Sequence, residues 1–133
     1  MSVLIEEFKK EHSKIIEAFK KVEESGIHTK EGHTKLMFLL PNLLNHLWDE
    51  DNQLYPVLRK ASEHNKKLKE ILSFFVNGLS TIHEEMLTLI TKYSKEVVKD
   101  SNFQREFERL FDVLSKRIQY EEEILYDEYN KLT

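Results

Sequence analysis

Four stretches of the chain repeat apolar residues at alternating steps of three and four, and this spacing constrains the fold more than any other feature. It places apolar side chains along one face of an α-helix. The 3 Gly and 2 Pro residues are too few for the many tight turns of a β-sandwich or barrel. We expect an all-α, up-down-up-down antiparallel four-helix bundle. Its helices should cover residues 2–24, 34–61, 66–98 and 102–131 of a single domain over 1–133.

The composition excludes several classes of function. The chain has no Cys, so it cannot hold a disulfide framework, a thiolate zinc site or a cysteine nucleophile. A formal net charge of −4 argues against a nucleic-acid surface. No apolar run approaches the roughly 20 residues that span a membrane, and the N-terminus has no signal-peptide pattern. We therefore expect a cytoplasmic protein without a nucleic-acid or membrane partner.

A shift of 71 residues superimposes the apolar pattern of the first half on that of the second. His12 then falls on His83, Glu50 on Glu121, and Leu54-Tyr55 on Leu125-Tyr126. His46 falls on Arg117, which breaks the match. The bundle is therefore predicted to consist of two pseudo-repeated helical hairpins. The two tyrosines are expected to pack at the ends of the bundle.

Several polar residues occupy positions in these apolar stripes. Residues opposite each other in an antiparallel hairpin are equidistant from its turn, and this geometry places the polar residues within about one turn of a common layer. The metal-ligand candidates are His12, His46, Glu50, His83 and Glu121. The remaining histidines, His28, His33 and His64, lie in or beside the expected loops.

A single histidine on an apolar stripe is more often a core residue with a hydrogen-bond partner than a ligand. A group of two carboxylates and three imidazoles does not fit that interpretation, because burying each unpaired carboxylate costs several kcal/mol of folding free energy. A divalent cation would offset that cost. Histidine with carboxylate and no sulfur suits iron, manganese or zinc. His46 and Glu50 are four residues apart, so one helix face can present both.

These motifs resemble the hemerythrin-like, or HHE cation-binding, domains over nearly the whole chain. KEHSKII carries His12, NHLWDEDNQLYP carries His46 and Glu50, TIHEEML carries His83, and IQYEEEILY carries Glu121. The resemblance implies a four-helix bundle with a non-haem di-iron centre bridged by two carboxylates. It also implies binding or sensing of O2 or another diatomic gas.

Two departures from that pattern concern the second half of the centre. Leu87 stands four residues after His83, where oxygen carriers have a second histidine, and Arg117 replaces the histidine of the last helix. Arginine stays protonated and is not a normal ligand. Three hypotheses follow: first, two ions bind unequally; second, one ion binds His12, His46 and Glu50 and Arg117 takes the place of the second cation; third, the site has decayed and does not hold a metal. In the first, the weaker ion would be completed by His83 with Glu84, Tyr120 or Glu122.

The functional prediction is an iron protein, with one or two non-haem ions, that binds or senses O2 or another diatomic ligand. Binding is favoured over catalysis, because no substrate pocket or separate general acid or base is evident. The alternatives are a metal-dependent oxidase or peroxidase with a role in stress, and a metal-free structural bundle.

Overall fold

The structure is a computed structural model that describes residues 2–93 and 101–132. It is a helical bundle, and no strand occurs within those residues. The elements are α1 (Val3–Ser25), α2 (Lys30–Gln53), α3 (Tyr55–Ser62), α4 (Lys66–Tyr93), α5 (Ser101–Tyr120), the π-helical turn η1 (Glu121–Leu125) and α6 (Tyr126–Lys131). They form four long segments, since α3 extends α2, and η1 with α6 extends α5. The predicted part of the third helix beyond Tyr93 lies outside the described residues.

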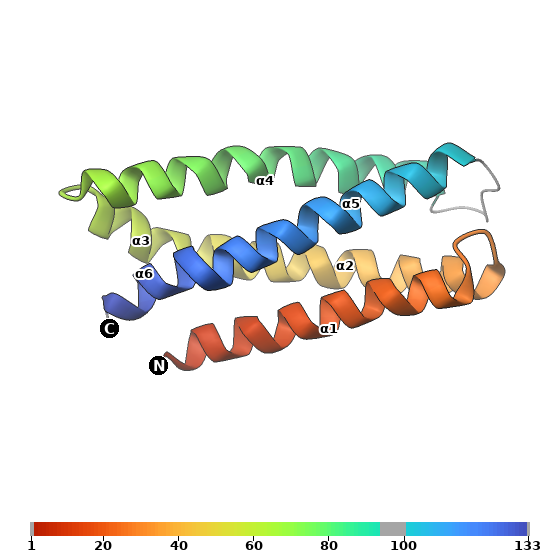
Figure 1. Cartoon of the computed structure of the whole chain (residues 1–133), viewed down its shortest axis with the longest axis horizontal. Coiled ribbons are helices and arrows are strands. Elements are labelled where there is room, and N and C mark those ends of the chain that lie inside the picture. Colours follow the sequence, from red (N-terminus) through yellow and green to blue (C-terminus); the bar gives the residue numbers. More distant parts are fainter. Residues whose placement is uncertain (1, 94–100, 133) are drawn as a thin grey trace.

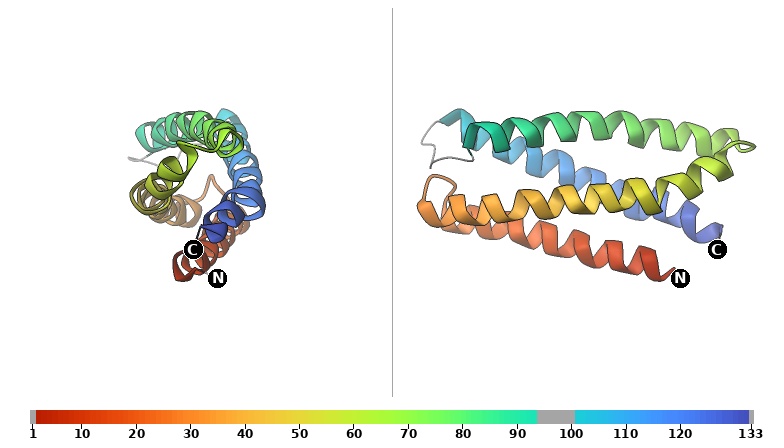
Figure 2. Two further views of the ribbon diagram at one scale, coloured as in Figure 1. Left: turned by 90° about the vertical axis from the view of Figure 1, so that its left-hand side faces the viewer. Right: turned by 180° about the vertical axis from the view of Figure 1, so that it is seen from behind.

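The four segments surround a common centre. The turn between α1 and α2 lies at one end of the bundle, and the turn between α3 and α4 lies at the other, near both termini (Figure 1). The end-on view shows α1, α2, α4 and α5 around the bundle axis (Figure 2). α1 packs mainly on α2, and α4 packs against both α3 and α5.

The second helix begins earlier than the sequence predicted. Thr29 caps α2 by accepting a hydrogen bond from the Gly32 backbone N–H through its hydroxyl, at 3.0 Å. A Cβ at Gly32 would lie 1.9 Å from the Gly26 carbonyl oxygen, so the tight turn before α2 needs glycine at this position. Gly32 therefore lies within α2, although the sequence predicted that the loop extends to about this glycine.

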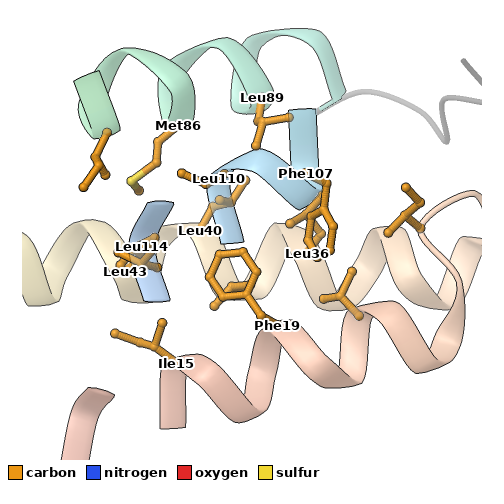
Figure 3. Packing of buried hydrophobic residues seen from close by; sticks show 14 of the residues in the cluster. Ile15, Phe19, Leu36, Leu40, Leu43, Met86, Leu89, Phe107, Leu110 and Leu114 are labelled. Carbon is orange, nitrogen blue, oxygen red and sulfur yellow. The ribbon is translucent and has the colours of Figure 1, made fainter. Parts of the chain in front are cut away.

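The apolar core is divided into two clusters. The cluster nearer the α1–α2 turn includes Phe19, Leu40, Met86, Phe107 and Leu110, which meet in Figure 3. The second cluster lies toward the termini and is built from Ile5, Phe8, Leu54, Tyr55, Leu58, Leu68, Leu72, Phe75, Leu125 and Tyr126. Along each of the four segments, the chain passes from one cluster to the other. The buried polar side chains lie at the boundary between the two clusters.

A candidate metal centre between two apolar clusters

A buried polar layer separates the two clusters. His12 lies between Phe8 and Ile15 on α1, and Glu121 lies between Ile118 and Leu125 at the end of α5. The buried polar and charged members of this layer are His12, His46, Glu50, Arg117 and Glu121, each no more than 7% exposed. Steps of three and four turn these side chains toward the core, and their similar distances from the turns of the bundle place them at one depth.

Four of these residues form a compact ligand set. His12, His46, Glu50 and Glu121 each offer one ligand atom, and these atoms lie within 4.8 Å of one another. They come from α1, α2 and the first residue of η1. Two imidazoles and two carboxylates at this spacing suit a divalent first-row metal ion.

The contact between His46 and Glu50 tests whether a metal fits. His46 Nε2 lies 2.8 Å from Glu50 Oε1, yet neither buried atom has a hydrogen-bond partner. On its other side, His46 Nδ1 lies 2.5 Å from Glu11 Oε1. An ionised carboxylate can only accept, so Nδ1 carries a proton, and in the neutral imidazole Nε2 then has a lone pair directed at Glu50. Two lone pairs facing each other in the core are costly unless a proton or a metal ion lies between them, so the donors present fit a metal ion.

Tyr126 reaches into the centre of the ligand set. Its hydroxyl lies 3.1 Å from His12 Nε2, 3.2 Å from Glu50 Oε2 and 3.3 Å from Glu121 Oε2. The π-helical turn η1 positions it, because the Tyr126 backbone N–H bonds to the Glu121 carbonyl five residues earlier. Leu125 and Tyr126, at the end of this turn, are both buried. Such turns occur frequently at functional sites.

Arg117 fills the other side of the layer. Its guanidinium donates to Glu121 Oε1 at 2.9 Å, the Phe75 carbonyl at 2.8 Å and the Tyr55 hydroxyl at 2.8 Å. Burial by itself lowers the pKa of Arg117, but attraction from Glu121, Tyr55 and then Glu50 raises it overall. The guanidinium is therefore a fixed positive charge beside the ligand set. Arg117 and Glu121, four residues apart, therefore form a buried ion pair.

The remaining charges do not balance. Burial raises the pKa of Glu121 well above its ordinary value, and the neighbouring Glu50 carboxylate raises it further. Burial also raises the pKa of Glu50. His12 stays neutral, since burial and then the nearby His46 and Arg117 lower its pKa to about 3. Two carboxylates and one guanidinium leave one excess negative charge, which needs either a shared proton or a cation.

His83 lies outside this ligand set. It is half-buried and lines a surface pocket with Leu44, Asn45, Trp48 and Asp51. The predicted placement in the core layer overlooked Ile82, because positions 82 and 83 both fit the rhythm between Leu79 and Met86. Ile82 takes the buried position at 1% exposure, and His83 is turned about 100° away from it.

Sequence reasoning missed three residues that hydrogen-bond to members of the polar layer. Tyr55 and Tyr126 are buried, but their hydroxyls bond within the polar layer, which packing at the ends of the bundle does not describe. Their matching positions in the repeat, five residues after Glu50 and Glu121, were the available signal. Glu11, adjacent to His12 in sequence, gave no periodic signal, because it lies on the partly exposed side of the apolar stripe.

The structure is a helical bundle with a buried group of His and Glu residues that could hold a metal ion. A comparison with protein families matches residues 3–129 to the family described as hemerythrin HHE cation binding domain. The chain therefore belongs to the hemerythrin HHE family, as the motifs indicated. Comparisons with curated proteins and with solved structures give no match. Within the described residues, none of the helices combines the length and apolarity needed to cross a membrane.

The raised carboxyl pKa values predict that metal binding releases protons. The raised pKa values favour a proton on Glu50 or Glu121 in the metal-free cluster, and a bound cation must displace that proton. Affinity should therefore fall as the pH is lowered from 8 toward 5. His12 stays neutral over this range and does not contribute. Titration calorimetry with Zn²⁺ in two buffers of different ionisation enthalpy should detect about one proton released per ion; zero release contradicts this charge balance.

Proposed function

We propose that this protein is a non-haem iron protein that holds one ion on His12, His46, Glu50 and Glu121. We propose that it uses the ion to bind or sense O2 or another diatomic ligand. The observation that carries the proposal is the unpartnered pair of His46 Nε2 and Glu50 Oε1, 2.8 Å apart in the core. The proposal includes an up-down-up-down bundle of two related hairpins, one domain over residues 1–133, and a cytoplasmic location.

The donor set supports iron. Imidazole with carboxylate, without sulfur, suits ferrous iron, and two histidines with a carboxylate form the facial triad of many non-haem iron proteins. When bound, iron supplies an open coordination position and an electron for a diatomic ligand. Around that position the chain contributes the Tyr126 hydroxyl, whose proton can be donated to Glu50 or Glu121. Burial keeps this phenol protonated by raising its pKa.

Charge balance supports one ion over two. One divalent ion would convert the single excess negative charge of the layer into a single positive charge. A second divalent ion, beside the Arg117 guanidinium, would leave three uncompensated positive charges in a low-dielectric interior. Arg117 already occupies the place next to Glu121 and pairs with it. We therefore assign Arg117 the role of the second cation.

The residues suggested for a weaker second ion are not gathered in one place. Tyr120 is 42% exposed and lines a groove with Phe74 and Gly78. Glu84 is exposed, and His83 lies in its own surface pocket. Only Glu122 approaches the ligand set, with Oε1 at 3.8 Å from His12 Nδ1. This dispersion favours the single-ion version.

Anaerobic loading with ferrous iron tests the function. We expect the loaded protein to change its visible absorption when O2 is admitted, and to recover the starting spectrum when O2 is removed under argon. Permanent oxidation with continued O2 consumption in the presence of a reductant would instead favour an oxidase. A chain that takes up no iron would favour a metal-free structural bundle.

A further inference from the structure

Glu11 connects the ligand set to the surface of the bundle. Its carboxylate comes from α1 and crosses to α2, where Oε1 lies 2.5 Å from His46 Nδ1. The Glu11 side chain is 39% exposed, whereas His46 is 4% exposed. The imidazole therefore lies between a partly solvated carboxylate on one side and Glu50 on the other.

This arrangement fixes how His46 presents itself to the core. A carboxylate that accepts from Nδ1–H holds the ring orientation, excludes the other tautomer and makes Nε2 a stronger donor to a cation. We propose that Glu11 is a positioning residue that sets the metal affinity of the site by holding His46 with Nε2 toward Glu50. This inference rests on the proposed metal site, and it adds a residue that does not itself contact the ion.

The second histidine has no equivalent support. The atom of His12 that faces outward, Nδ1, is buried without a hydrogen-bond partner, and Glu122 Oε1 is 3.8 Å away. That separation is too long for a hydrogen bond. Of the two imidazoles, His46 alone is therefore hydrogen-bonded to a supporting carboxylate. Because His12 has no such carboxylate, removing Glu11 removes all support of this kind from the two histidines.

A surface pocket makes the role of Glu11 testable by chemical rescue. The pocket has a volume of about 390 Å³, and its lining includes Glu11, Lys14, Asn45 and His46. Shortening Glu11 to alanine would leave space next to His46 Nδ1 that opens into this pocket. A small carboxylate such as formate can occupy that space and accept the same hydrogen bond. Lys14, at the same pocket, adds a positive charge that favours an anion.

The experiment measures Co²⁺ affinity by competition with a chromophoric chelator. We expect Glu11→Gln to weaken binding by about 10- to 100-fold, the usual effect of losing a carboxylate that orients a ligand histidine. Glu7→Gln is the matched control, because Glu7 is an exposed glutamate one turn earlier on α1 and its loss changes the net charge equally. The Co²⁺ absorption spectrum should change only in the Glu11 variant.

Formate should restore the affinity of Glu11→Ala toward that of the wild type while leaving Glu7→Gln unchanged. A loss of affinity that formate does not restore would overturn the positioning role, as would equal affinities for the Glu11 and Glu7 variants. Far-UV circular dichroism of the metal-free variants establishes that each bundle is folded. If the wild type itself binds neither Co²⁺ nor Fe²⁺, the proposed metal site fails, which is a different result from a wild type that binds while Glu11→Gln binds equally well.

Discussion

Replacing Arg117 by histidine is expected to raise the bound iron from one ion per chain to two. The substitution removes the guanidinium that pairs with Glu121 Oε1 and contacts the Tyr55 hydroxyl. It also supplies an imidazole four residues before Glu121, which is the spacing of His46 and Glu50 on α2. Loss of one fixed positive charge lowers the cost of a second divalent ion.

Metal analysis of the anaerobically loaded Arg117→His variant measures this effect. Lys116→His is the matched control, since it introduces the same imidazole one position away on a side chain that is 65% exposed. The control should keep one ion per chain. A folded Arg117→His variant that still holds a single ion would contradict the view that Arg117 takes the place of the second cation.

Replacing His46 by alanine is expected to abolish specific metal binding. His46 supplies the unpartnered Nε2 that faces Glu50, and among the described residues His12 is the one other imidazole grouped with these carboxylates. The loss should exceed the roughly 10- to 100-fold expected for a supporting residue alone, because a ligand itself is removed. His83→Ala is the matched control, since His83 lies outside the ligand set.

Thermal unfolding provides the readout for these histidine variants. A metal ion at 100 times its dissociation constant stabilises the folded chain by about 2.7 kcal/mol, which raises the Tm by several degrees. The wild type and His83→Ala should show this rise with Co²⁺, and His46→Ala should not. An unchanged rise in His46→Ala, or its loss in His83→Ala, would show that the metal binds elsewhere.

The periodic apolar pattern predicted the helices and most of the site, because both depend on which helix face is buried. His12, His46, Glu50 and Glu121 interrupt an apolar stripe at core positions, so their burial follows from spacing alone. His83 was misplaced because Ile82 fits the same stripe. Burying the isoleucine recovers hydrophobic free energy, whereas a buried imidazole needs a partner.

The contacts of Tyr126 and Glu11 depend on features that spacing does not encode. Tyr126 reaches the ligands because the π-helical turn at Glu121–Leu125 inserts one residue into the helix. Glu11 reaches His46 across the α1–α2 interface, a contact set by how two helices pack and not by the periodicity of either one.

The number of iron ions that the wild-type chain holds is the most direct test of this account. Anaerobic reconstitution with excess Fe²⁺, removal of loosely bound metal and elemental analysis against protein concentration give that number. One excess negative charge in the layer and the Arg117–Glu121 pair predict one ion per chain. Two tightly held ions per chain would contradict it.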